Sequence, residues 1–295
     1  MPIPIAQLNT WKNQGGTTSS ALAYAAIERA LTAPTSPLRG KNITLFLQGS
    51  YRNHTNVHAD SDIDVVCLFD DTQTTNSATL PLADQQRIAQ GPPAGYLIQD
   101  LRRDVLSSLR SAFGTERVHD GRRAIQVNTG HGREADVVPA IRYLHYYSQF
   151  LLPPAFHEGI ALLGGNQWIY NFPRQHIANG EAKNAMARTG GNYKPTVRLF
   201  KNARSKAVER GLLADGDAPS YFIEGMLYNV PDNLFTADAE DTFVDVFNHL
   251  DQSNLATLMS QNGIIPLVGH SSTQWQVDAA QRFLAGLRRL WNEWQ

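Results

Sequence analysis

The sequence predicts an α+β protein, in which a small mixed sheet with helices is followed by a helical half. Two observations lead to this prediction. Apolar, β-branched runs typical of buried strands occur at residues 43–48, 63–70, 124–129 and 135–141. Beyond about residue 146 such runs fade, and apolar residues recur at helical spacing instead. We therefore expect two parts, residues 1–145 and residues 146–295.

The first half begins with a helix and two strands. Residues 17–33 start with a Thr/Ser run and carry apolar residues at helical spacing until Pro34 ends the pattern. ITLFLQ (43–48) and IDVVCLFD (63–70) indicate buried strands. The polar, breaker-rich segment 73–86 that follows predicts a mobile loop.

A further helix and a strand pair complete this half. Residues 95–113 alternate apolar and basic side chains at helical spacing. Strands at 124–129 and 135–141 are joined by the tight GHGR turn at 130–133. This turn imitates the glycine fingerprint of dinucleotide-binding proteins, but a strand follows where that fingerprint needs a helix. We therefore expect a hairpin turn.

The second half is predicted to be helical. Helical patterns occupy 194–211, 220–230, 239–252 and 278–294.

Composition restricts the classes of function. With 26 basic and 27 acidic residues the net charge is -1, so we expect no long nucleic acid as a partner. The composition does not exclude a local basic groove. The single cysteine, Cys67, excludes a disulfide framework and multi-cysteine zinc modules. There is no signal-peptide pattern and no apolar run of about 20 residues. These features predict a cytoplasmic protein without a membrane partner.

Two aspartates stand at the start of the second strand. Because side chains alternate along a strand, Asp62 and Asp64 project to the same side. Two carboxylates this close repel each other, and a hard divalent cation such as Mg²⁺ compensates the repulsion. Asp136 is the one acid inside the apolar run ADVVPAI, where burying a charge without a compensating partner is costly. Together the three predict a two-ion site.

Other interpretations of the pair are open at this point. A D-x-D before a strand is often an ordinary acidic turn. Asp60, Asp62 and Asp64 also have calcium-loop spacing, but Val65 and Asp71 stand where that loop needs glycine and glutamate. His54 and His58 have a metal-ligand spacing, yet no cysteine or third histidine lies nearby in the sequence.

A Gly-Ser step precedes the aspartates. Gly49 ends the first strand and allows a phosphate to approach the backbone, and Ser50 can offer its hydroxyl and amide. A strand, a Gly-Ser turn and a second strand with D-x-D place a triphosphate beside metal ions. This combination resembles the polymerase-β-like nucleotidyltransferase superfamily.

More of the chain resembles one family within it, the cGAS/DncV-like nucleotidyltransferases (CD-NTases). The similar segments, in family order, are TWKNQGG, LQGSYRNHTNV, SDIDVV, ADVVPAI, NYKPTVRLFKNAR and PSYFIEGMLYNVP. The resemblance implies a nucleotidyltransferase core with a helical second lobe like that of oligoadenylate synthases. It also implies synthesis of cyclic di- or oligonucleotide messengers in bacterial anti-phage defence (CBASS), with regulatory or effector proteins of the same system as partners.

The resemblance assigns roles to individual residues. Asp62, Asp64 and Asp136 match its catalytic carboxylates, which bind two Mg²⁺ or Mn²⁺ ions. By the same resemblance, Asp136 is expected to act as general base. The phosphate-holding turn corresponds to Gln48, Gly49 and Ser50. Donor phosphates are contacted at Lys201 and Ser220, and a base stacks on Tyr221.

Each of these last roles has an alternative. Lys201 could be a solvated helix residue, Ser220 a helix N-cap and Tyr221 a core aromatic. Lys194 is a further possible phosphate contact. Two other functions also stay open: a nucleotidyltransferase acting on RNA, protein or a small molecule, and a non-catalytic nucleotide-binding module.

Overall fold

The computed structural model describes residues 2–16, 18–57, 62–90, 94–132, 134–147, 155–271 and 274–294. The chain forms two compact units. The first, here called the helical unit, comprises Met1–Gly16, Gly49–Ala59 and Arg174–Gln295, and the second, the sheet unit, comprises Thr17–Gln48 and Asp60–Pro173. The segment after the first strand therefore belongs to the helical unit by its contacts, although it lies between two strands of the sheet in sequence.

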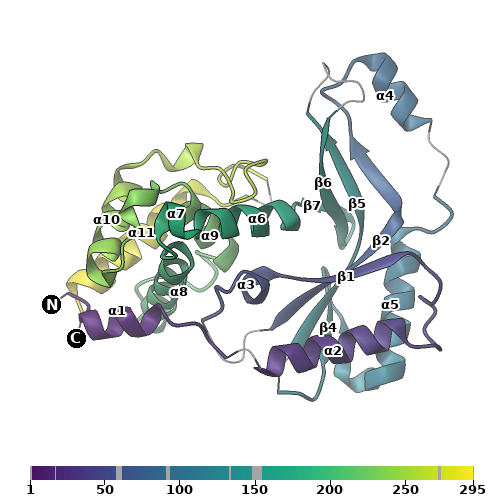
Figure 1. Ribbon diagram of the computed structural model, residues 1–295, viewed down its shortest axis with the longest axis horizontal. Helices are drawn as coiled ribbons and strands as arrows, with labels where there is room; N and C mark the ends of the chain where they lie inside the picture. The colour runs from purple at the N-terminus through teal and green to yellow at the C-terminus, as the bar shows by residue number, and fades with distance from the viewer. Residues whose placement is uncertain are drawn as a thin grey trace. The chain divides into compact units, whose positions relative to one another are not determined.

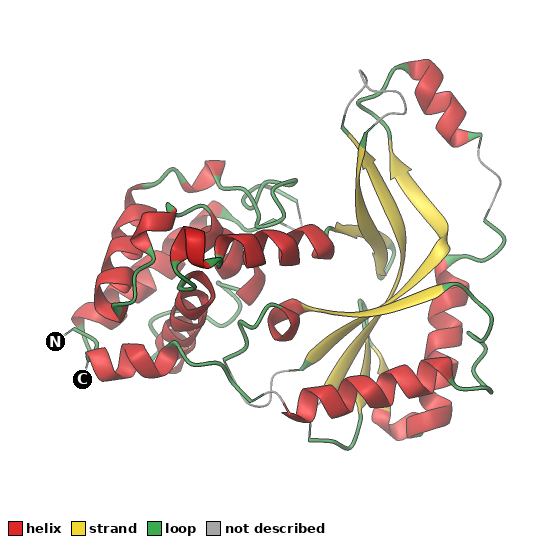
Figure 2. Cartoon of the chain, viewed as in Figure 1, coloured by secondary structure: helices red, strands yellow, loops and turns green. Residues whose placement is uncertain are grey.

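The sheet unit is built on a seven-stranded mixed sheet (Figures 1 and 2). The strands are β1 (Ile43–Gln48), β2 (Ile63–Asn76), β3 (Val118–Asp120), β4 (Ile125–Asn128), β5 (Glu134–Tyr146), β6 (Phe156–Gly164) and β7 (Gln167–Asn171). Their order is β1-β2-β5-β4-β3, and β6 and β7 extend the sheet from β5. Only the β2–β5 pair among these is parallel. The predicted α+β fold with a mixed sheet is confirmed.

Two long helices of the sheet unit support its central strands. Helices α2 (Thr18–Thr32) and α5 (Ile98–Phe113) contact each other and β5, and α2 also contacts β2 (Figure 1). Ile27 and Leu101 are among their fully buried side chains. On β2, burial raises the pKa of the Cys67 thiol to about 12, so this thiol stays protonated. Both helices and the β4–β5 hairpin agree with the sequence prediction, with Arg133 of the turn outside the described residues.

The mobile loop predicted over 73–86 is wrong. Strand β2 continues to Asn76, and helix α4 (Leu82–Ala89) follows it (Figure 1). After a register shift between Phe69 and Gln73, residues Gln73–Asn76 pair with Arg142–His145 of β5. The polar local sequence gives no sign of this pairing, because the partner strand that satisfies the backbone lies far away in sequence.

The expected change from sheet to helix at residue 146 also needs correction. Strands β6 and β7 follow that point, and the sheet unit extends to Pro173. Gly165, with a φ of 71°, makes the turn between them. A glycine turn flanked by apolar runs is a recognisable hairpin signal that our sequence interpretation missed. The helical unit resumes at Arg174.

The helical unit is organised around α8 (Tyr193–Glu209), which contacts α1, α9, α10 and α11. The helical unit also contains α1 (Ile5–Trp11), α3 (Gly49–Arg52), α6 (Pro173–Lys183), α7 (Met186–Thr189), α9 (Ser220–Tyr228), α10 (Ala239–Gln252) and α11 (Val277–Asn292). Val197, Phe200 and Phe283 are 0% exposed in its core. The four predicted helices of the second half correspond to α8, α9, α10 and α11.

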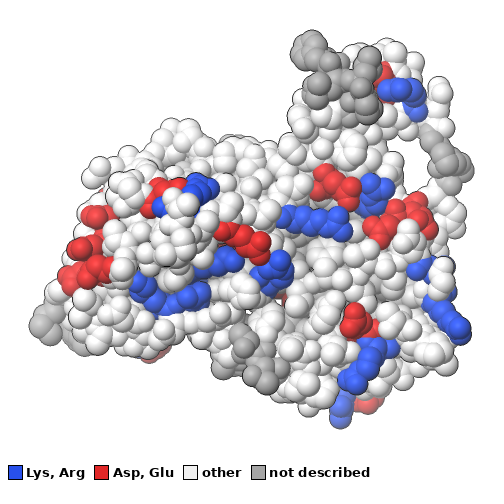
Figure 3. Space-filling model, in the orientation of Figure 1, with Lys and Arg blue, Asp and Glu red and all other residues white. Residues whose placement is uncertain are grey.

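The distribution of surface charge and the character of the helices agree with the composition. Acidic and basic side chains intermingle on the face drawn in Figure 3, as the nearly equal numbers of each predict. Within the described ranges, every helix is too short or too polar to cross a bilayer.

Candidate active site

Asp64 and Asp136 are direct neighbours in the sheet. They are register partners on the parallel strands β2 and β5, so their side chains leave the same face. On the outer sides, Gln48 of β1 pairs with Asp64, and Gln126 of β4 pairs with Asp136. Four polar residues therefore form one row across four strands.

The third predicted carboxylate acts on this row electrostatically. Asp136 is half-buried, and burial together with the nearby charge of Asp62 raises its pKa above the ordinary value of 3.8. A hydrogen bond from Gln126 works in the opposite direction, and Glu134 adds to the rise. Asp62 thus lies near enough to Asp136 for their charges to interact.

Carboxylate oxygens are the donors that Mg²⁺ prefers, and the chemistry of this set fits such an ion. The described part of the chain contains no group of three or more His, Cys, Asp or Glu side chains placed to hold a metal ion. The structure thus pairs Asp64 with Asp136 and brings the Asp62 charge near, and the metal site itself stays a prediction.

The Gly-Ser turn lies in the helical unit, at the start of α3. Gly49 has a φ of 70°, in the left-handed region where glycine has no steric penalty. Its carbonyl accepts the Asn53 N–H at 3.1 Å, and the Ser50 carbonyl accepts the Thr55 N–H at 2.9 Å. The turn is therefore closed on itself by the residues that follow it.

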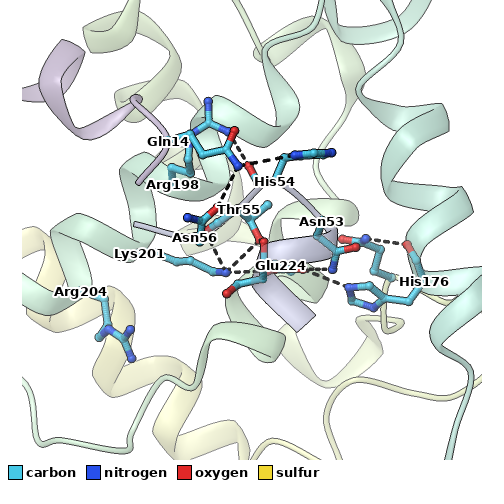
Figure 4. Close-up of polar contacts among 12 residues, drawn as sticks. Gln14, Asn53, His54, Thr55, Asn56, His176, Arg198, Lys201, Arg204 and Glu224 are labelled. Carbon is cyan, nitrogen blue, oxygen red and sulfur yellow. Dashed lines mark hydrogen bonds and ion pairs between the residues drawn. The ribbon is translucent and has the colours of Figure 1, made fainter. Parts of the chain in front are cut away.

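Those following residues are anchored on a buried glutamate that the sequence interpretation missed (Figure 4). Glu224 of α9 is 3% exposed. It accepts hydrogen bonds from Thr55 Oγ1 at 2.6 Å and from Asn53 Nδ2 at 3.1 Å. A signal was present, because Glu224 is the one acid in the apolar helix SYFIEGMLYNV, the same argument that drew attention to Asp136.

Lys201 lies in the same network. Its side chain is 1% exposed, so the solvated alternative is wrong. The ammonium lies 2.5 Å from Glu224 Oε1 and also donates to Thr55 Oγ1 at 3.1 Å. Burial lowers the pKa of Lys201 although Glu224 raises it. Burial alone would raise the pKa of Glu224, but Lys201 and His176 hold it well below the ordinary value of 4.5. A contact between Lys201 and phosphate stays a prediction.

Ser220 and Tyr221 open helix α9. Ser220 is the first helical residue and Pro219 occupies the N-cap position, so the structure does not use Ser220 as the cap. The Tyr221 ring stacks on His176, with ring centroids 5.2 Å apart and planes at 20°. Asn262 Nδ2 donates to the Tyr221 hydroxyl at 3.3 Å. Tyr221 is partly buried against the core of the helical unit.

Basic residues on α8 hold neighbouring backbone. Arg198 donates to the carbonyls of Lys12 and His54, both at 2.6 Å, and Arg204 donates to the carbonyl of Ala218 at 2.9 Å. Lys194 is half-buried, and burial lowers its pKa. Of the proposed histidine pair, His54 adopts a φ of 57°, and His58 is outside the described residues.

Comparison with known proteins identifies the family of this chain. A model of the cGAS/DncV-like nucleotidyltransferase C-terminal helical domain matches residues 178–292. The "Cyclic UMP-AMP synthase" of Rhodothermus marinus is 38% identical over 296 residues, covering 100% of this chain and 99% of that protein. The chain belongs to the cGAS/DncV-like nucleotidyltransferase family.

Other members of this nucleotidyltransferase family agree over the full length. "Cyclic nucleotide synthase CdnE01" of Staphylococcus haemolyticus is 34% identical and covers 100% of both chains. The solved structure of Rhodothermus marinus CdnE c-UMP-AMP synthase with Apcpp and Upnpp has a TM-score of 0.90 and 36% identity, over 99% of this chain and 98% of that chain. The family resemblance is confirmed, and the protein is a nucleotidyltransferase.

Proposed function

We propose that this nucleotidyltransferase joins nucleoside triphosphates into a cyclic di- or oligonucleotide messenger. The observation that carries the proposal is the register pairing of Asp64 with Asp136, beside the charge of Asp62. The names of the two relatives support it, since one is named a cyclic UMP-AMP synthase and the other a cyclic nucleotide synthase. Effector or regulatory proteins of cytoplasmic anti-phage defence are the partners that this proposal implies.

In this scheme Asp62, Asp64 and Asp136 would hold two Mg²⁺ or Mn²⁺ ions, which would activate the acceptor hydroxyl and neutralise charge on the leaving pyrophosphate. A ribose hydroxyl attacks the α-phosphorus in line, and the bond to pyrophosphate breaks. The hydroxyl proton passes to Asp136.

The remaining roles concern the substrate nucleotides. We assign Gln48, Gly49 and Ser50 to the triphosphate, because the left-handed Gly49 keeps side-chain atoms away from the backbone there. Lys201 and Ser220 are assigned to the same phosphates. We assign Tyr221 to base stacking, for which an aromatic face is suited.

The test is incubation of the purified protein with α-³²P-labelled nucleoside triphosphates and Mg²⁺ or Mn²⁺, followed by phosphatase and separation. UTP and ATP are the first pair to use, because the Rhodothermus marinus relative is named for those bases. A labelled product that resists phosphatase and requires Asp64 supports the proposal. A phosphatase-sensitive or macromolecule-bound product indicates another acceptor. Tight nucleotide binding without pyrophosphate release indicates a binding module.

A further inference from the structure

Four side chains converge on the Glu224 carboxylate (Figure 4). Asn53 and Thr55 come from the segment after α3, Lys201 from α8 and His176 from α6. The carboxylate is ionised, since its pKa is held low, and it can only accept. His176 therefore presents its Nε2–H to Glu224 Oε2, at 3.0 Å.

Two of these donors also close the Gly-Ser turn. Asn53 donates its side-chain amide to Glu224 and its backbone N–H to the Gly49 carbonyl. Thr55 donates its hydroxyl to Glu224 and its backbone N–H to the Ser50 carbonyl. Lys201 adds a bond to the Thr55 carbonyl at 3.3 Å. The position of both turn carbonyls is thus set by residues whose side chains are fixed on one carboxylate.

The same carboxylate orients an aromatic ring. His176 is 6% exposed, and its ring lies nearly parallel to that of Tyr221. Its Nε2 bond to Glu224 restrains the imidazole, and the stacked imidazole in turn restricts the tyrosine ring. Tyr221 also lies one turn before Glu224 on α9, so helix and histidine link the two residues independently.

We propose that Glu224 is a positioning residue, which fixes the Gly49–Ser50 turn and the Tyr221 ring together in the geometry that binds a nucleoside triphosphate. This inference rests on the proposed function for the roles of those three residues. Stability alone is a weak explanation for the buried charges, because well-packed apolar residues often replace a buried ion pair without loss. A carboxylate with donors from three segments fixes geometry in a way that apolar packing does not.

The experiment compares Glu224→Gln with Asp232→Asn in the full chain. Asp232 pairs with another buried lysine of the same unit, Lys183, at 2.8 Å, and the other described bond of that ammonium goes to Val230. Both substitutions leave a buried lysine without its carboxylate, but only the first touches the turn. Two quantities are measured: hydrogen exchange of the Asn53 and Thr55 amides, and kcat and KM for ATP with Mg²⁺.

In Glu224→Gln we expect both amides to exchange at least about tenfold faster and KM to rise at least about tenfold, equivalent to ~1.4 kcal/mol of lost binding, with a smaller change in kcat. Asp232→Asn should leave both quantities unchanged. Equal effects in the two variants, or none in Glu224→Gln, overturn the inference. The exchange measurement needs no catalysis, so an inactive wild type counts against the proposed function alone.

A second pair of variants guards against failure to fold. Thr55→Val removes one hydroxyl and retains the ion pair between Lys201 and Glu224. Lys201→Met combined with Glu224→Leu removes both charges and leaves no unpaired ion. We expect both variants to fold. In both, the backbone amides of residues 53 and 55 should exchange faster than in the wild type. Wild-type exchange in folded protein carrying the double substitution contradicts a positioning role.

Discussion

Asp64 and Asp136 are register partners on two adjacent parallel strands, although 71 residues separate them in sequence. Parallel strands cannot be joined by a tight hairpin, so the connection between them is long. Here it contains α4, α5 and the β3–β4 strands. The short strand spacing of about 4.8 Å then holds the two carboxylates together, which their mutual repulsion alone would oppose.

Asp64→Asn should lower the rate of product formation by about a thousandfold or more, because it removes one carboxylate of the pair without changing side-chain size. The fold should be retained, since Asp64 is only half-buried. The labelled-nucleotide assay and a thermal melt measure the two quantities. Glu158→Gln, on β6 and outside the row, is the control and should keep its activity. Wild-type product from Asp64→Asn contradicts the assigned role.

Asp136→Asn should raise stability near neutral pH while it removes activity. The folded-state pKa of Asp136 is raised, chiefly by burial and by Asp62. The folded protein therefore binds more protons than the unfolded chain between the ordinary value of 3.8 and the raised value, and stability falls as pH rises through that window. Above it the charged carboxylate is destabilising, and asparagine removes that charge. Urea unfolding of both proteins at several pH values checks this; a less stable variant at neutral pH refutes it.

Two neighbours should shift the pKa of Asp136 in opposite directions. Gln126→Leu removes the hydrogen bond that lowers the pKa, so the pKa should rise. Glu134→Gln removes a nearby negative charge, so the pKa should fall. Carboxyl NMR titration of labelled aspartate measures both shifts, with the wild type as reference. Shifts of the same sign in the two variants are incompatible with this explanation.

Lys201→Met should destabilise the protein by about 3–5 kcal/mol, because it leaves Glu224 charged and buried. Adding Glu224→Leu should recover much of the loss, since no unpaired charge then remains. Lys206→Met is the control: it breaks the pair with Glu209, whose side chain is 65% exposed, and should cost about 0–1 kcal/mol. Denaturant unfolding gives all three values. A double variant less stable than Lys201→Met disagrees with the prediction.

Gly49→Ala should cost about 1–2 kcal/mol, because Gly49 has a φ of 70°, where a Cβ is strained. Nucleotide affinity should also fall, as the strain distorts the turn. Gly40→Ala is a matched control, since Gly40 has a φ of 78° and nothing within 4 Å of an added Cβ. Its stability loss should be similar and its affinity unchanged. Affinity is measured by calorimetry with a non-hydrolysable ATP analogue. Equal affinity losses in the two variants would show that the Gly49 turn has no specific role in nucleotide binding.

Local sequence predicted the regular elements wherever side-chain patterning reflects burial. The apolar run at 63–70 and the helical spacing in 239–252 both correspond to observed elements. Prediction failed at Gln73–Asn76, where a polar segment gains its hydrogen-bond partners from β5, and at β6 and β7, whose glycine turn was overlooked.

Residue chemistry by itself predicted a role for Asp64 and Asp136, because a charge in an apolar strand needs compensation, and placed Asp62 with them. The motifs also predicted the family. Only the tertiary structure decided that Asp64 pairs with Asp136 and that Lys201 is buried against Glu224. The physical reason is that strand register and side-chain desolvation depend on partners distant in sequence, so neither a lysine nor a glutamate in a helix shows by itself whether it faces water or another charge.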